Sequence, residues 1–166
     1  PINTNNGFLL ERYIITDKIA IKDAGLLYEN VSGWSEMTIG VLETEGKYHA
    51  FNPSITVAEG DVLSLEEKFQ GGTGINITPP PVTIISDQSL SKVKHNIEKL
   101  ALHLGIKNYA RIDIFVENST GRIMVIEANS LPALTPSTVI YHQALQENPS
   151  MNPIQFLEWL IDHAIC

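Results

Sequence analysis

Two β-rich runs joined by a short polar segment place the strongest constraint on the fold of this chain. Residues 109–117 and 122–129 alternate apolar with polar side chains, and Asn118-Ser119-Thr120-Gly121 lies between them. A period of two is typical of strands with one buried face, and a short connection containing glycine favours an antiparallel pair. The sequence therefore predicts a β-hairpin over 109–129.

The register of this hairpin decides which side chains meet. A three-residue loop that ends with Gly121 in the left-handed conformation would place Asn118 opposite Arg122. In that register Asp113 lies directly opposite Glu127. The opposite face would then carry apolar side chains that point into a core, namely Ile112, Ile114, Ile126 and Ala128.

The predicted polar face carries two carboxylates that would repel one another, so a cation should lie between them. One interpretation is a divalent ion held by Asp113, Glu127 and the amide oxygen of Asn129, as in magnesium sites that leave room for phosphates. The other is that Arg111, opposite Asn129, neutralises the pair alone. The pattern leaves both open, because a shift of one residue would separate the carboxylates onto opposite faces.

The rest of the chain mixes strands with helices. The alternation over 36–44 predicts a strand that pairs with 47–51. The apolar spacing over about 87–104 predicts a helix that Ser86 or Asp87 caps and that stops at Gly105. The dipeptides Thr135-Pro136 and Asn152-Pro153 predict two later helix starts, with proline at the first helical position. The first of these helices should run to about residue 145. An apolar stripe on the second is expected to cover the sheet: Phe156, Leu157, Leu160 and Ile161. These elements predict an α+β fold.

Residues 52–86 are rich in proline and glycine, which excludes a continuous helix or a central strand there. A long segment of this kind is either a functional lid or a disordered loop, and the pattern leaves both open.

Composition narrows the function classes. With 19 acidic and 11 basic residues and a net charge of -8, the chain lacks the basic surface that nucleic-acid binding needs. No apolar stretch reaches the roughly 18 residues of a membrane span and no signal peptide is visible, so we expect a cytoplasmic protein. The single Cys166 excludes a disulfide framework, and the start at Pro1 suggests a fragment of a longer protein.

Three segments together resemble a known family. Ala110-Arg111-Ile112-Asp113, followed by the run from Ile126 to Thr135, resembles the C-terminal signature of the D-alanine–D-alanine ligases in the ATP-grasp superfamily. Upstream, Glu66-Glu67-Lys68-Phe69 resembles the mobile loop of that family. The resemblance implies that residues 1–166 are the C-terminal part of an ATP-grasp domain, with a mostly antiparallel sheet flanked by helices.

For the phosphate end of the site, the resemblance implies a role for each matching residue. Asp113, Glu127 and Asn129 would hold two Mg²⁺ ions, with Mn²⁺ as a substitute. Arg111 would stabilise the tetrahedral intermediate, and Lys68 would reach the transferred phosphate.

For the nucleotide, Glu29, Val31 and Ser32 resemble the adenine hinge. Glu36 resembles the acid that binds the ribose, and Phe115 would pack near the base.

For the amino-acid substrates, the backbone N–H near Ala133 and the side chain of Thr138 would be binding groups. Ala133 stands where the family usually has glycine, which requires a negative φ. Phe69 stands where a tyrosine is common, and family members with phenylalanine there tend to accept D-lactate.

The resemblance therefore implies an ATP-dependent carboxylate–amine ligase that acts on small D-amino acids in peptidoglycan synthesis, with the missing N-terminal part of the same protein as its partner. A homodimer is left open. Two alternatives also stay open: a depsipeptide ligase of the D-alanine–D-lactate type, and a non-catalytic lobe for nucleotide binding or assembly.

Overall fold

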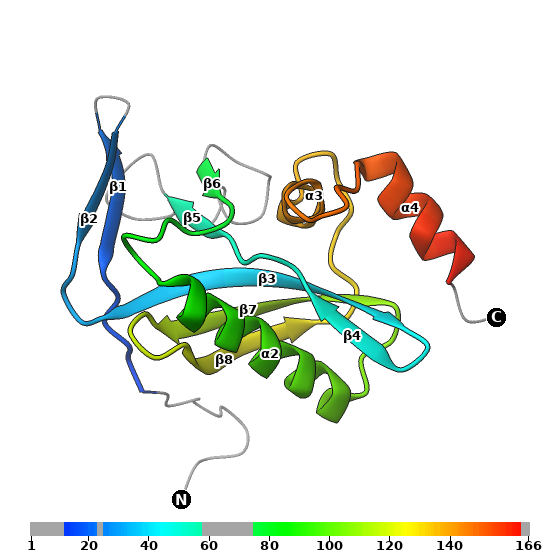
Figure 1. Cartoon of the computed structure of the whole chain (residues 1–166), viewed down its shortest axis with the longest axis horizontal. Coiled ribbons are helices and arrows are strands. Elements are labelled where there is room, and N and C mark those ends of the chain that lie inside the picture. The colour runs from blue at the N-terminus through cyan, green and yellow to red at the C-terminus, as the bar shows by residue number, and fades with distance from the viewer. Residues whose placement is uncertain (1–11, 23–24, 58–74, 164–166) are drawn as a thin grey trace, which may run out of the picture.

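A four-stranded antiparallel sheet in the order β4-β3-β7-β8 forms the centre of the protein (Figure 1). The computed structural model describes residues 12–22, 25–57 and 75–163. The strands of this sheet are β3 (Trp34–Thr44), β4 (Lys47–Ala50), β7 (Tyr109–Glu117) and β8 (Arg122–Asn129).

Two small antiparallel sheets and three helices complete the described part of the chain. The small sheets pair β1 (Lys18–Lys22) with β2 (Gly25–Glu29) and β5 (Ile55–Val57) with β6 (Ile75–Ile77). The helices are α2 (Asp87–Leu104), α3 (Val139–Leu145) and α4 (Pro153–Asp162). The predicted α+β class is confirmed.

One face of the central sheet packs on α2 and forms the main core. Alternate residues of β3 and β7 point into it, and every even-numbered residue of β7 is buried. The helix begins as predicted, since the Ser86 side chain accepts a hydrogen bond from the backbone N–H of Ser89, and it ends at the left-handed Gly105. The buried residues from these three elements are Met37, Ile39, Val41, Val93, Ile97, Ala101, Ala110, Ile112, Ile114 and Val116.

The other face of the sheet is divided into two halves. The covered half, around Leu42 and Tyr109, lies under α3 and α4 and shares a second apolar cluster with Phe51, Ile140 and Phe156. The polar half, along the rest of the same strands, carries the side chains of these three cross-strand rows: Glu36, Phe115 and Met124; Thr38, Asp113 and Glu127; Arg111 and Asn129.

Gly40 and Gln143 mark the boundary between the two halves. A Cβ atom at Gly40 would lie 2.8 Å from Phe51, 2.9 Å from Gln143 and 2.9 Å from Ile140, so only glycine lets α3 approach β3 this closely. The fully buried Gln143 side chain accepts a hydrogen bond from the Gly40 N–H at 2.7 Å and donates one to the Thr38 carbonyl at 2.8 Å. It thereby satisfies backbone groups of β3 that β4 does not reach.

The turn of the 109–129 hairpin differs from the prediction. Glu117, not Asn118, lies opposite Arg122, and a β-bulge between Val125 and Glu127 then shifts the pairing by one residue. The predicted pairs of Asp113 with Glu127 and of Arg111 with Asn129 are confirmed because of this bulge. Two predicted core positions are wrong: Ile126 is 43% exposed, and Ala128 is also exposed.

Two predictions about the late helices need correction. Helix α3 begins at Val139, because residues 135–138 form a turn in which the Thr138 N–H donates to the Thr135 carbonyl at 2.9 Å. Only half of the predicted stripe on α4 is covered: Phe156 is fully buried and Leu160 packs against the same cluster, but Leu157 is 40% and Ile161 74% exposed. The predicted start of α4 is confirmed, with the reciprocal cap between Asn152 and Gln155.

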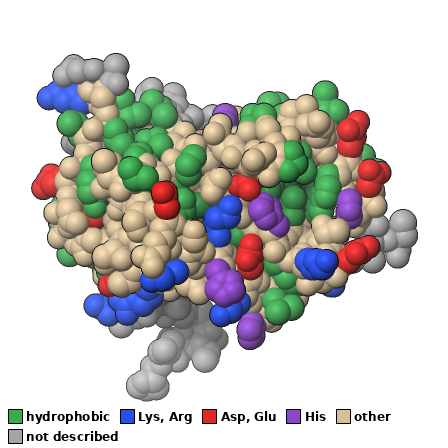
Figure 2. Space-filling view, in the orientation of Figure 1, with side chains coloured by type: hydrophobic (Ala, Val, Ile, Leu, Met, Phe, Trp, Pro, Cys, Tyr) green, Lys and Arg blue, Asp and Glu red, His purple; other side chains and the backbone are tan. Residues whose placement is uncertain are grey.

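The surface around α2 and β4 mixes charges of both signs. Acidic, basic and histidine side chains are interspersed across the face shown in Figure 2. There Glu147 contacts His49 at 2.9 Å and Lys94 at 3.6 Å, which ties β4 and α2 to the end of α3. No helix in the described ranges is long and apolar enough to cross a membrane.

Candidate functional site

The centre of the polar half is a row of three side chains from three neighbouring strands. Thr38 in β3 lies opposite Asp113 in β7, which lies opposite Glu127 in β8. The Thr38 hydroxyl donates to Asp113 Oδ1 at 2.8 Å, and the Asn129 amide donates to Glu127 Oε1 at 2.9 Å. Two carboxylates and an amide from different strands therefore share one face of the sheet.

Arg111 lies in the next row, and one of its guanidinium nitrogens contacts this cluster. Its Nη2 lies 3.4 Å from Asp113 Oδ2, which is long for a hydrogen bond between charged groups. Its Nε is buried and has no hydrogen-bond partner among the described residues. A buried, unsatisfied cationic donor is rare in native structures, and it is a suitable partner for an anionic oxygen such as that of a phosphate.

Burial is the main cause of the raised pKa of the Asp113 carboxyl group. It raises the pKa of Asp113 above its ordinary value, against the hydrogen bond from Thr38 and the charge of Arg111, which lower it. The neighbouring Glu127 raises the pKa further. A cation beside the two carboxylates would offset both unfavourable effects.

These side chains fit a divalent cation of the Mg²⁺ type. Carboxylate and amide oxygens are the ligands that this hard ion prefers, and Asp113, Glu127 and Asn129 bring three such groups to one place. Within the described ranges, no three His, Cys, Asp or Glu side chains are grouped for metal binding, so two carboxylates and one amide are the donor set offered here. The contact between Arg111 and Asp113 means that the alternative of an ion-pair cluster is also partly present.

The predicted nucleotide residues divide into two groups. Glu36 lies opposite Phe115, one row from the carboxylates and on the same face, so the sheet brings these two residues together with the acidic pair. Glu29 lies at the end of β2, where it contacts Lys18 at 3.5 Å, and Val31 and Ser32 follow in the loop before β3. The roles of all five stay predictions.

Asp17 organises that loop, and the sequence reasoning missed it. Its Oδ1 accepts hydrogen bonds at 2.8 Å from the backbone N–H groups of Val31, Ser32 and Gly33. Its Oδ2 accepts from the Tyr28 hydroxyl at 2.8 Å and from the Asn118 amide at 3.0 Å. These partners lie 11 to 101 residues away in the sequence, so no local signal could have identified this role.

Asp17 is only 6% exposed, yet it stays acidic. Burial by itself would raise the pKa of its carboxyl group. The hydrogen bonds from the backbone of Ser32, the Tyr28 hydroxyl and the backbones of Gly33 and Val31 outweigh burial, and the pKa lies below its ordinary value. The folded state therefore favours the ionised form.

Two of the predicted substrate residues, Ala133 and Thr138, come after the last strand of the central sheet in the sequence. Ala133 has no positive φ, so the condition for replacing glycine there is met. Thr138 is buried and is the N-cap residue of α3, although its side chain makes no capping hydrogen bond. Lys68 and Phe69 lie outside the described residues.

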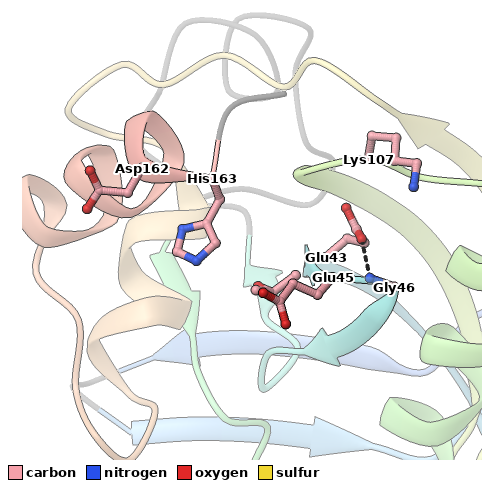
Figure 3. Close-up of a pocket in the computed structure, with 7 residues that line it drawn as sticks. Glu43, Glu45, Gly46, Lys107, Asp162 and His163 are labelled. Atoms are coloured by element: carbon pink, nitrogen blue, oxygen red, sulfur yellow. Dashed lines mark hydrogen bonds between the residues drawn. The ribbon is translucent and has the colours of Figure 1, made fainter. Parts of the chain in front are cut away.

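A hollow of about 440 Å³ lies at the opposite end of β3 and is not part of this site. It is lined by the turn after β3 together with Lys107, Asp162 and His163 (Figure 3). The Glu43 carboxylate in its wall accepts hydrogen bonds from the backbone N–H groups of Gly46 at 2.6 Å and Asn108 at 3.3 Å, so it stabilises the turn. Thr38 and Thr44 are six positions apart along β3, which separates the two places by about 20 Å.

Comparison with known proteins identifies relatives of the whole described region. A family model described as "D-ala D-ala ligase C-terminus" matches residues 10–162. A D-alanine–D-alanine ligase of Leptospira biflexa is 29% identical over 156 residues, which are 92% of this chain and 43% of that protein. One of Pediococcus pentosaceus is 30% identical over 131 residues, 78% of this chain and 34% of that protein. The chain thus spans less than half the length of these relatives.

Solved structures show the same fold. D-alanyl-alanine synthetase A from Vibrio cholerae superposes with a TM-score of 0.58 at 17% identity, over 83% of this chain and 41% of that one. An L-amino acid ligase from Bacillus licheniformis gives 0.54 at 15% identity, over 90% of this chain and 39% of that one. The fold is therefore that of the C-terminal lobe of ATP-grasp ligases.

Proposed function

The chain belongs to the family of D-alanine–D-alanine ligase C-terminal domains, and from this premise we propose that it is the C-terminal lobe of an ATP- and Mg²⁺-dependent ligase that joins two amino acids of the D-alanine class. The observation that carries the proposal is the pairing of Asp113 with Glu127 on the polar half, next to a buried Arg111 Nε that has no hydrogen-bond partner in the described part of the chain. We also propose that the protein is cytoplasmic and that residues 1–166 are part of a longer chain.

Asp113, Glu127 and Asn129 would hold the metal. When bound, Mg²⁺ offsets the negative charge of the ATP phosphates. The three residues come from the facing strands of one hairpin, so their relative positions are set by backbone pairing on one side of the β-bulge and not by a loop. That rigidity suits a site in which small displacements reduce the rate strongly.

Two bond exchanges make up the proposed reaction. A carboxylate oxygen of the first amino acid attacks the γ-phosphorus of ATP, ADP leaves, and an acyl phosphate forms. The amine of the second amino acid then attacks the acyl carbon, loses a proton and expels phosphate. Arg111 would donate hydrogen bonds to the oxygens on which negative charge develops, together with the backbone N–H near Ala133. Lys68 would reach the transferred phosphate.

The nucleotide would extend from the metal row toward Glu36 and Phe115. Glu36 would accept hydrogen bonds from the ribose hydroxyls, and the Phe115 ring would pack near the base. The loop with Val31 and Ser32 would border the adenine, beside Glu29. In this structure the N–H groups of Val31, Ser32 and Gly33 are bound by Asp17, and the Ser32 hydroxyl donates to the Ile15 carbonyl at 2.6 Å. These groups of the loop are therefore already engaged within the protein.

The second amino acid would bind near Thr138. The names of the relatives identify D-alanine as their substrate, and we propose a substrate of the same class for this protein. The depsipeptide alternative rests on Phe69 alone.

The decisive experiment measures phosphate release and dipeptide formation by the full-length protein with ATP, Mg²⁺ and D-alanine. We expect turnover by the wild type and a loss of at least about 100-fold for Glu127→Gln, since even the outer partners of metal ligands are worth 10- to 100-fold. The melting temperature should change little, because Glu127 is exposed.

Glu117→Gln is the matched control. Glu117 lies on the same face of the sheet, opposite Arg122 and outside the three rows of the polar half, so its variant should keep wild-type turnover. A wild type without turnover would support the non-catalytic alternative. Full activity of Glu127→Gln would contradict the metal site.

A further inference from the structure

Thr38 is the third member of the row that contains the acidic pair, and the proposed function gives it no role in the reaction. Its hydroxyl lies 2.8 Å from Asp113 Oδ1, and Arg111 lies 3.4 Å from the other carboxylate oxygen. The hydrogen bond from Thr38 is therefore shorter than the contact from Arg111. We propose that Thr38 is a positioning residue for the metal site, an inference that rests on the proposed function and deepens it.

A hydroxyl donor suits this task better than a charged one. It holds one carboxylate oxygen without adding positive charge next to the place where a cation would bind. An ionised carboxylate offers about four lone-pair sites, so a single hydrogen bond to Oδ1 leaves acceptor capacity for the metal on the same group. The β-branched side chain of Thr38 also has few χ1 rotamers, which fixes the direction of the hydroxyl.

The backbone of Thr38 is itself held on the side where β4 has already left the sheet. Its N–H donates to the Ser54 carbonyl at 2.9 Å, and the Ser54 N–H donates to the Thr38 carbonyl at 2.8 Å. The Thr38 carbonyl also accepts a hydrogen bond from the buried Gln143 amide at 2.8 Å. These contacts keep the Thr38 hydroxyl in place next to Asp113.

The same arrangement links the metal site to α3. Gln143 belongs to that helix and binds β3 at both Thr38 and Gly40. Thr38 then contacts Asp113 across the strand pair. The position of Asp113 is therefore determined by a helix on the covered half as well as by its own hairpin.

The size of the effect follows from how such partners act. Groups that orient a metal ligand from outside the coordination sphere typically change metal affinity by 10- to 100-fold. Loss of the Thr38 hydroxyl should fall at the lower end, about tenfold, because Arg111 still contacts the other oxygen of Asp113.

The test is an electron paramagnetic resonance titration of Mn²⁺ into the full-length protein saturated with ADP. We expect Thr38→Val to raise the dissociation constant of Mn²⁺ about tenfold, while Thr38→Ser, which restores the hydroxyl, stays within about twofold of wild type. Thr56→Val is the matched control: it removes a threonine hydroxyl that donates to Asn76 at 2.7 Å in the separate β5–β6 sheet, and it should leave Mn²⁺ binding unchanged.

Two outcomes would overturn the inference. One is a Thr38→Val protein that folds and binds Mn²⁺ as tightly as the wild type. The other is an equal loss for Thr38→Ser and Thr38→Val. If Thr38→Val does not fold, Thr38→Ala decides the question by the same criterion.

Asp113→Asn separates the inference from the proposed function. If Asp113→Asn abolishes Mn²⁺ binding and Thr38→Val does not affect it, only the role of Thr38 is wrong. If Asp113→Asn itself has no effect on binding, the metal site of the proposed function is wrong as well.

Discussion

The covered half and the polar half belong to the same face of the same sheet, yet they are built in opposite ways. In the covered half, Leu42 and Tyr109 lie under the apolar residues of α3 and α4. In the polar half, the same two strands carry Thr38 and Asp113, joined by a hydrogen bond of 2.8 Å. The alternation of the strands is the same in both, so alternation alone does not distinguish a packing face from a chemical one.

The difference arises at Gly40. Without a side chain there, α3 can settle directly on β3, and its Gln143 replaces the hydrogen bonds of a missing strand. Beyond Gly40, Gln143 still donates to the Thr38 carbonyl, but the side chains of the three rows are not part of the apolar cluster that α3 and α4 form with the sheet. A single small residue thus sets the border between the two halves.

The largest effect on stability should come from filling this border. Gly40→Ala would place a methyl group under 3.0 Å from three buried side chains, and we expect a loss of about 3 kcal/mol in the free energy of unfolding, at the upper end for overpacking. Urea denaturation measures it. Gly25→Ala is the control, because its nearest neighbour would be at an ordinary 3.5 Å. Equal stabilities for the two variants would mean that the covered half is loosely packed.

A smaller, pH-dependent effect is expected at the end of the polar half, where Asp17 holds the loop before β3. Asp17→Asn should lower the free energy of unfolding by about 2 kcal/mol at neutral pH, since hydrogen bonds to a buried charged group are lost. The folded-state pKa of Asp17 lies below its ordinary value of 3.8, so its contribution is complete above that pH and declines as the pH falls through the folded-state pKa. The gap between wild type and variant should therefore narrow in acid.

Denaturant titrations at neutral pH and below pH 3.8 check this prediction. Tyr28→Phe, which removes only the hydroxyl bonded to Asp17 Oδ2, should give a smaller loss than Asp17→Asn. A gap that stays constant or widens in acid would contradict the assignment of Asp17 as an ionised group.

The smallest effect is expected at the exposed rim of the polar half. Arg122 contacts Glu117 at 3.3 Å and lies over the Trp34 ring at 5.0 Å, but its side chain is 65% exposed. We expect Arg122→Ala to change the free energy of unfolding by about 0.5 kcal/mol, because solvent and salt screen such contacts. Raising the salt concentration should reduce the difference. A loss above about 2 kcal/mol would mean that the rim is part of the core.

The hairpin shows how far local pattern extends. The pairing of Asp113 with Glu127 was predicted from an assumed three-residue loop, but the loop is one residue longer and a bulge at Ile126 restores the pair. Without the bulge, Glu127 would face away from Asp113. The bulge inserts one residue that the assumed register did not contain, so the sequence predicted the correct pair for a reason that the structure does not support.

Local signals determined the strands of the central sheet, the three helices and the chemistry that these strands carry, but they did not predict β1, β2, β5 or β6. Strand alternation, the Ser86 and Asn152 caps and the left-handed Gly105 and Gly121 depend on neighbours a few residues away, and all were visible in the sequence. Which elements cover which part of the sheet was decided only by tertiary structure. The bonds of Thr38 to Asp113 and of Gln143 to Gly40 join residues 75 and 103 positions apart. Such contacts form only when the chain has packed, because interactions between sequence neighbours do not determine which distant residues will meet.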